Sequence, residues 1–243
     1  LAAPLWLAFL TVGVSLRLEQ GLPEANLIAW CQQFCAPDRV LVDVGAHVGT
    51  YCVSLAPFVA TAHAFECQPD TYYALCGSIA LSQVSHRVVA HCMALGDGAT
   101  AFQTLHVVSA DGGGSTLHKD ASPSAHAPTL TQYCVPIRTL DSLDLKGTIG
   151  LVKIDVEGHE AAVLRGAKQT LQNSQWPPIV YERWLHASEA NVKLHAELDH
   201  VLTAYGYVSQ TIPGYPHMQL ALHTTDPRTH DECFSWSPKD LPS

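Results

Sequence analysis

Charged residues are scarce in this 243-residue chain, since Asp, Glu, Lys and Arg make up 14% of it, against about 25% in an average soluble protein. Basic residues are the scarcer kind: 13 Lys and Arg stand against 22 Asp and Glu, a net charge of −9 with histidine neutral. No basic cluster interrupts this balance, which disfavours nucleic acid as a partner. Hydrophobic residues reach 47%, which excludes a disordered chain and a coiled coil.

The C-x-x-C spacing is absent from the eight cysteines, so neither a dithiol redox motif nor a zinc ribbon is indicated. Cys52, Cys67 and Cys92 fall in or beside apolar runs. We therefore expect buried free thiols, which are typical of a reducing compartment. A cytoplasmic location is the corresponding prediction.

Charge is missing altogether from the first sixteen residues, Leu1 to Leu16. A membrane-spanning helix needs about 20 apolar residues, so this run is short. It fits the end of a membrane anchor, the apolar part of a signal peptide, or a segment that packs on the domain. We favour local packing, and membrane tethering is the alternative if sequence precedes Leu1.

Short apolar runs alternate with amphipathic segments in the rest of the chain. This rhythm predicts an α/β domain with a parallel sheet covered by helices on both faces. The predicted strands are 40–44, 61–65, 87–93, 149–154 and 179–182, and the predicted helices are 23–35, 49–57, 69–82, 160–171 and 188–205.

Residues 94–138 break this rhythm with two predicted strands, 102–108 and 133–137. The loop between them, 111–129, is rich in small residues and long enough to be functional, and a lid is one hypothesis. A hairpin at 207–210 and 218–223 ends the sheet. We expect an N-terminal segment at 1–38 that packs on the core, one domain at 39–223 with an insertion at 98–138, and a tail at 224–243.

The first predicted strand leads into a glycine turn, Asp43-Val44-Gly45-Ala46-His47-Val48-Gly49. Such a turn lets a ligand approach the backbone. The glycine pattern of a dinucleotide site and the lysine of a P-loop are both missing. Asp43 would repel a pyrophosphate but suits a ligand that carries an ammonium group, such as S-adenosylmethionine.

Glu66 closes the second predicted strand, 17 residues after Gly49. An acidic residue at this position can accept hydrogen bonds from both hydroxyls of a ribose. Taken alone, a helix cap or a solvated charge would explain it equally well.

Several motifs follow one another along the chain: DVGA at 43–46, AFE at 64–66, ALGD at 94–97, RTLD at 138–141, KIDVEGHE at 153–160, VLRGA at 163–167 and PIVYE at 178–182. Their order and spacing resemble the FkbM family of methyltransferases from about residue 39 to 222. Two features depart from that pattern: His47 stands where the family usually has Asn, and Cys67-Gln68-Pro69 replaces a tighter Glu-Pro junction.

This resemblance implies a class I Rossmann-like methyltransferase fold, with a seven-stranded, mostly parallel sheet, an antiparallel last strand and a β-hairpin insertion after the third strand. It implies transfer of a methyl group from S-adenosylmethionine to a hydroxyl oxygen. It places Gly45, Ala46 and His47 at the methionine end of the cofactor. The expected cofactor-binding residues are Asp43, Gly45, Ala46, His47, Gly49, Glu66, Cys67, Met93, Ala94 and Asp155.

The catalytic candidates follow the fourth and fifth strands of this expected sheet. Asp155, Glu157 and His159 come after the fourth strand and Glu182 ends the fifth, so all four should meet at the carboxyl edge, where ligands bind. An alcohol needs a base to accept its proton during methyl transfer. One of these residues is expected to be that base, while Asp155 could instead hold the cofactor's amino group or the acceptor hydroxyl.

Three alternatives remain open at this point. The carboxylates and histidine could hold a divalent metal, although their spacing matches no established signature and no metal is expected. The chain could have kept the fold without activity. It could also be an RNA ribose 2'-O-methyltransferase, since Lys153, Asp155 and Glu182 partly match the residues of those enzymes, but a second lysine is missing. The favoured partner is a small-molecule or carbohydrate acceptor.

Overall fold

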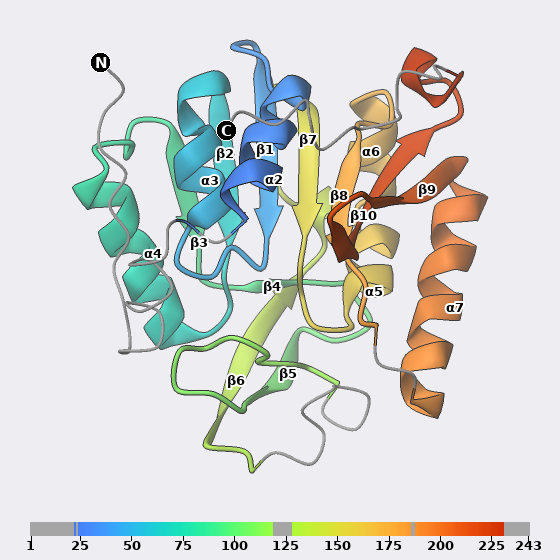
Figure 1. Ribbon diagram of the computed structural model, residues 1–243. Helices are drawn as coiled ribbons and strands as arrows, with labels where there is room; N and C mark the ends of the chain where they lie inside the picture. Colours follow the sequence, from blue (N-terminus) through green and yellow to red (C-terminus); the bar gives the residue numbers. More distant parts are fainter. Residues whose placement is uncertain (1–21, 23, 119–127, 186–187, 231–243) are drawn as a thin grey trace.

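A seven-stranded sheet in the order β3-β2-β1-β7-β8-β10-β9 forms the centre of the computed structural model (Figure 1), which describes residues 22, 24–118, 128–185 and 188–230. Neighbouring strands run parallel from β3 to β8, whereas β10 is antiparallel to both β8 and β9. The expected α/β sheet with an antiparallel last strand is therefore confirmed. Its strands are β1 (Arg39–Val44), β2 (Thr61–Phe65), β3 (Val88–His91), β7 (Thr148–Ile154), β8 (Ile179–Glu182), β9 (Tyr207–Ile212) and β10 (Tyr215–His223).

Helices cover both faces of this sheet. Successive side chains of a strand point to opposite sides, so a strand of consecutive apolar residues needs an apolar partner on each face. The helices are α2 (Ala25–Cys31), α3 (Thr50–Leu55), α4 (Pro69–Leu81), α5 (Glu160–Arg165), α6 (Lys168–Asn173) and α7 (Glu189–Ala204), with 3₁₀ turns at Gln32–Phe34, Ala56–Phe58, Leu140–Ser142 and Pro227–His230. Leu41 joins the apolar cluster under α2, α3 and α4, while its neighbours Val40 and Val42 join the cluster under α5, α6 and α7.

The single helix predicted over 160–171 is wrong, because the structure divides it into α5 and α6 around Gly166. A Cβ at Gly166 would lie 1.9 Å from the carbonyl oxygen of Gly96, so the two backbones touch here. The Asp141 backbone N–H then donates to the Gly166 carbonyl, and the Asp141 carboxylate accepts two backbone N–H groups in the first turn of α6. A contact between segments distant in sequence therefore ends α5 early.

The insertion supplies two strands, β5 (Phe102–Val107) and β6 (Thr131–Arg138), of a second, three-stranded sheet, and β4 (Ala94–Leu95), just before the insertion, is the third. β5 and β6 are antiparallel, which confirms the expected hairpin, and β4 adds a parallel strand beside β6. Figure 1 shows this sheet below the carboxyl ends of β1 and β7. The insertion thus lies over the edge where ligands bind in this architecture.

Strand ends differ from the predictions by a few residues. The terminal hairpin is longer than expected, and β3 ends at His91 rather than continuing to Met93. Cys92 consequently lies outside the sheet and is exposed, and Cys67 is half-buried, so of the three thiols named above the expected full burial holds for Cys52. The cysteines that the structure describes are free.

Parts of the sequence predictions lie outside the described residues. These are the apolar run Leu1 to Leu16, most of the tail, Cys233 and residues 119–127 of the long loop. Among the residues that are described, no helix has both the length and the apolar character needed to cross a membrane.

Candidate active site

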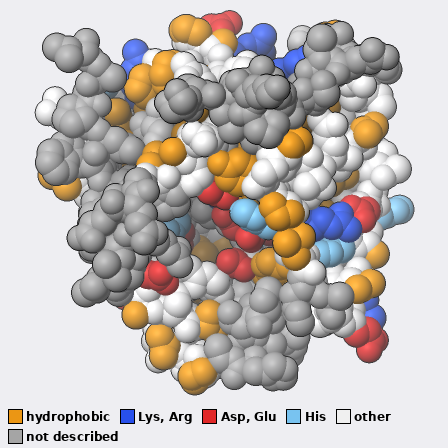
Figure 2. Space-filling view, viewed as in Figure 1, with side chains coloured by type: hydrophobic (Ala, Val, Ile, Leu, Met, Phe, Trp, Pro, Cys, Tyr) orange, Lys and Arg blue, Asp and Glu red, His pale blue; other side chains and the backbone are white. Residues whose placement is uncertain are grey.

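A cavity of about 380 Å³ opens between the carboxyl edge of the large sheet and the insertion. This volume is within the usual range for small-molecule sites. Figure 2 shows acidic side chains gathered around a hollow in the middle of this face. The cavity wall contains most of the predicted cofactor-binding residues, namely Gly45, Ala46, His47, Glu66, Cys67, Met93, Ala94 and Asp155.

The turn after β1 brings backbone, rather than side chains, to this wall. Gly45 has a φ of 75°, and a Cβ there would lie 1.7 Å from the Asp155 carbonyl oxygen. Only glycine fits such a close approach in this conformation. The N–H groups of Gly45 and Ala46 both donate to the Phe65 carbonyl, which ties the turn to the end of β2.

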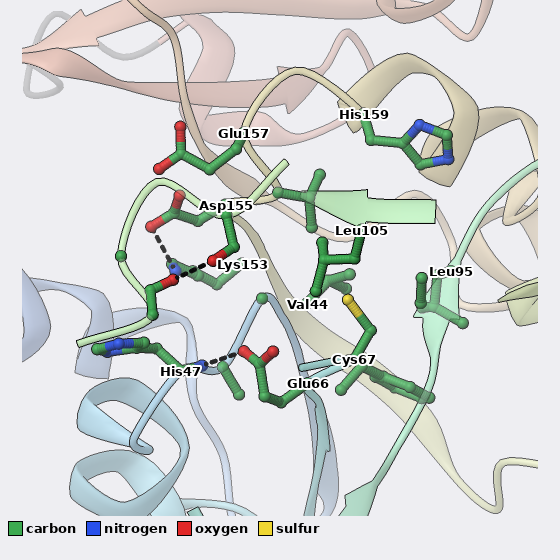
Figure 3. A pocket seen from close by; sticks show the side chains of 18 of the residues that line it. Val44, His47, Glu66, Cys67, Leu95, Leu105, Lys153, Asp155, Glu157 and His159 are labelled. Carbon is green, nitrogen blue, oxygen red and sulfur yellow. Dashed lines mark hydrogen bonds and ion pairs between the residues drawn. The ribbon is translucent and has the colours of Figure 1, made fainter. Parts of the chain in front are cut away.

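Glu66, just beyond β2, holds its carboxylate at a fixed place on the wall. Its Oε2 accepts the His47 backbone N–H at 3.0 Å (Figure 3), and its Oε1 accepts the Gln68 backbone N–H at 2.8 Å. Burial raises the pKa of the Glu66 carboxyl. Each carboxylate oxygen keeps a further lone pair, so Glu66 can accept hydrogen bonds from two hydroxyls of a ligand.

Three carboxyl groups converge beside the cavity, and we call Asp155, Glu157 and Glu182 the acid trio. One oxygen from each lies within 4.8 Å of the others. Glu157 adopts a left-handed φ of 53°, a conformation that is uncommon outside glycine and frequent at functional sites. Oxygens of this kind suit a divalent cation, but the Lys153 ammonium already lies 3.0 Å from Asp155 and balances part of the charge.

The pKa values of the acid trio are pushed apart. Burial opposes ionisation of Asp155, but the Lys153 ammonium outweighs it and the pKa of Asp155 lies below its usual value. Burial, followed by the negative charge of Asp155, raises the pKa of Glu157 to about 7 and that of Glu182 to about 10. At neutral pH Asp155 is therefore ionised, Glu182 is protonated and Glu157 titrates. Separated pKa values in one cluster are the property that acid–base catalysis requires.

His159 lines the same cavity as Asp155 and Glu157, but its side chain does not join the acid trio. Figure 3 shows its ring turned away from Asp155 and Glu157, because the chain bends at Gly158, with a φ of 97°, before α5 begins. The ring Nδ1 lies 2.8 Å from Nε2 of His118 in the insertion. Burial, with a smaller contribution from His118, lowers the pKa of His159 to about 4, so its ring is neutral.

Two of the predicted cofactor residues lie behind the cavity wall. Asp43 is fully buried in β1 on the side of α3, where its Oδ2 accepts the Cys52 backbone N–H at 3.0 Å. Gly49 shapes the start of α3, since a Cβ there would lie 2.9 Å from Leu75 of α4. Among the described residues, neither belongs to the cavity wall.

The sequence left several wall residues unassigned, including Glu24, Tyr51 and Lys153. Lys153 had a visible signal, because it alternates with Asp155 along the strand exit. Glu24 had none, since it lies far from every motif. Trp184 was also missed, and its indole Nε1–H donates to Glu157 Oε2 at 2.9 Å.

Part of the insertion lies across the cavity, and we call residues 111–118 the strap. The Asp111 carbonyl lies 2.7 Å from His47 Nε2, and Thr116 Oγ1 donates to the Glu157 carbonyl at 2.7 Å. Residues 112–115 line the cavity. The strap therefore connects the glycine turn with the acid trio.

Comparison with known proteins agrees with this geometry. The chain matches the family model described as the methyltransferase FkbM domain over residues 43–209. No curated protein sequence matches it. A crystal structure of methyltransferase FkbM from Methylobacillus flagellatus KT superposes with a TM-score of 0.50 at 16% identity, covering 76% of this chain and 44% of that one. This chain thus spans less than half the length of that protein.

Two O-methyltransferase structures are similar over most of their length. The enzyme from Bacillus cereus, in complex with S-adenosylhomocysteine, has a TM-score of 0.51 at 10% identity and covers 86% of this chain and 87% of its own. TomG from Streptomyces achromogenes, in complex with S-adenosylmethionine, has a TM-score of 0.50 at 15% identity, covering 83% and 80%. The fold is that of the class I Rossmann-like methyltransferases. The family match extends over well over half of the chain, which therefore belongs to the FkbM methyltransferase family.

Proposed function

We propose that this protein is an S-adenosylmethionine-dependent O-methyltransferase whose acceptor is a hydroxyl group of a small molecule or a sugar. One observation carries the proposal: a single cavity joins the backbone turn at Gly45, the fixed carboxylate of Glu66, and Asp155 and Glu157 of the acid trio. The turn and Glu66 suit the cofactor, and the acid trio suits the chemistry of an alcohol.

The residues present fit this cofactor. Gly45 leaves room for a ligand against the backbone, and Glu66 has lone pairs left for the two ribose hydroxyls. A wall that carries Asp155 and Glu66 favours a cationic ligand. S-adenosylmethionine supplies a methyl group on a positively charged sulfur. Met93 and Ala94, which line the same cavity as Glu66, are proposed to lie along the adenine.

Glu157 is proposed to accept the proton of the acceptor hydroxyl. Its pKa of about 7 allows it to be ionised at physiological pH and still take up a proton. The indole N–H of Trp184 fixes one carboxylate oxygen, and the strap holds the Glu157 backbone carbonyl. Asp155, held ionised by Lys153, is proposed to accept a hydrogen bond that orients the acceptor.

Calorimetric titration of the purified protein with S-adenosylhomocysteine tests the cofactor. We expect micromolar binding, and no binding of NAD or GTP, because the dinucleotide glycine pattern and the P-loop lysine are missing. A panel of hydroxylated acceptors, assayed with methyl-labelled cofactor, then tests the reaction. Cofactor binding without turnover of any acceptor would favour a non-catalytic protein, and absence of cofactor binding would overturn the proposal.

A further inference from the structure

A residue outside the matched family region lines the cavity. Glu24 immediately precedes α2, whereas the family model begins at residue 43. Its carboxylate lines the cavity, where Oε2 accepts the Tyr51 hydroxyl at 2.7 Å and Oε1 lies 3.1 Å from Nε2 of His217 on β10. Glu24 adopts a left-handed φ of 55°, which these contacts hold in place. Three segments distant in sequence therefore meet at one carboxylate.

Tyr51 connects the Glu24 carboxylate with Lys153. The tyrosine is buried, and the Lys153 ammonium lies 4.9 Å from the centre of its ring, a cation–π contact. Lys153 is also buried, with 4% of its surface exposed, and its Nζ donates to Asp155 Oδ2 at 3.0 Å. A buried ammonium depends on its few partners for its position. The ring of Tyr51 therefore helps to decide how close the ammonium stays to Asp155.

We propose that Glu24 is a positioning residue for methyl transfer, acting through Tyr51 and Lys153 on Asp155 of the acid trio. The inference rests on the proposed function for its catalytic consequence. Without Glu24 the Tyr51 ring can shift and the ammonium can leave Asp155. Asp155 then attracts a proton, and the arrangement in which Asp155 is ionised and Glu182 is protonated is lost.

Three substitutions in the full chain separate this role from simple loss of packing. Glu24→Ala removes the acceptor of the Tyr51 hydroxyl, whereas Glu24→Gln keeps an oxygen that can accept it. Tyr51→Phe keeps the ring but removes the hydroxyl. Glu189→Ala, at an exposed carboxylate of α7 with a side-chain exposure of 87%, is the matched control.

We expect Glu24→Ala and Tyr51→Phe to lower kcat about tenfold, for the first acceptor that the panel identifies. The Kd for S-adenosylhomocysteine should stay within about twofold, because Glu66 and the glycine turn are intact. Glu24→Gln should recover most of the activity, and Glu189→Ala should match the unmodified protein.

Carboxyl titration gives a second readout that needs no acceptor. In protein labelled with ¹³C at the glutamate carboxyls, the Glu182 resonance, assigned with Glu182→Gln, should titrate at alkaline pH. In Glu24→Ala its midpoint should move to higher pH, because the Lys153 ammonium then offsets less of the negative charge that Asp155 carries at alkaline pH. An unchanged midpoint together with unchanged kcat would overturn the inference. If the unmodified protein does not bind S-adenosylhomocysteine, the proposed function is overturned. The carboxyl titration would still test whether Glu24 acts through Tyr51 and Lys153 on Asp155.

Discussion

The charge of one lysine determines where protons sit in the acid trio. Lys153 keeps Asp155 ionised, and the negative charge of Asp155 then adds to burial in raising the pKa of Glu157 and Glu182. Glu182 stays protonated across the physiological range. Glu157 is therefore the member whose charge changes near neutral pH, which makes its ionisation the step most open to measurement.

The pH dependence of activity should follow Glu157. Because a base must be ionised to accept a proton, kcat/KM should rise with pH through about 7. Trp184→Phe removes a hydrogen bond that favours the carboxylate, so the rise should move to higher pH. Glu157→Gln should lower kcat about 100-fold or more. A profile that is the same in all three proteins would exclude Glu157 as the base.

Glu66 should matter for cofactor affinity and much less for proton transfer. Glu66→Gln removes the charge and one acceptor, which should weaken binding of S-adenosylhomocysteine by about 1–2 kcal/mol, or roughly tenfold. Calorimetry measures this directly. Glu157→Gln is the matched control, since it changes a carboxyl at the other end of the cavity and should leave the Kd unchanged. Equal affinity for both variants would remove Glu66 from the ribose site.

At the scale of elements, the sequence predicted what local patterns determine. Short apolar runs placed the strands, and strand order brought Asp155, Glu157 and Glu182 to one edge. The direction of a side chain within that frame depended on packing between distant segments. Asp43 faces α3 instead of the cavity for this reason, and Glu24 reaches the cavity from a segment with no motif.

The strap is the element that links the insertion to Glu157, the proposed base. Thr116 is fully buried, and its hydroxyl donates to the Glu157 carbonyl while accepting the His118 backbone N–H at 2.9 Å. Thr116→Val keeps the shape but leaves both groups without a partner, which should lower the free energy of unfolding by about 1–2 kcal/mol. It should also lower kcat, because the Glu157 backbone is no longer held.

Denaturant unfolding and the acceptor assay measure these two effects. Thr104→Val is the matched control, since Thr104 lies exposed on β5 and the same substitution there removes no buried contact. If Thr116→Val behaved like the control in both assays, the strap would have no role in positioning Glu157.

At the scale of the whole molecule, buried groups of opposite kinds make stability depend on pH in opposite directions. Burial raises the pKa of Glu160 to about 7, so its contribution is fully present below the unfolded pKa near 4.5 and is lost as pH rises through 7. His63 on β2 behaves in the opposite way. Its Nδ1 lies 3.0 Å from Nε2 of His91 on β3, and burial, followed by His91, lowers its pKa to about 4. Lowering the pH therefore increases the contribution of Glu160 to the free energy of unfolding and decreases the contribution of His63.

The contribution of His63 can be isolated by comparing variants rather than by following the unmodified protein alone. Between pH 6.5 and 4, His63 is protonated in the unfolded chain but neutral in the folded protein. The contribution of His63 to stability therefore falls as the pH falls. His63→Gln cannot take up that proton, and its stability relative to the unmodified protein should improve by about 1 kcal/mol from pH 7 to 5, after allowance for partial exposure. Urea unfolding at both pH values measures the difference. His86→Gln, at an exposed histidine, is the control and should show no such change. Equal behaviour of the two variants would show that the His63–His91 pair does not make the edge of the sheet sensitive to acid.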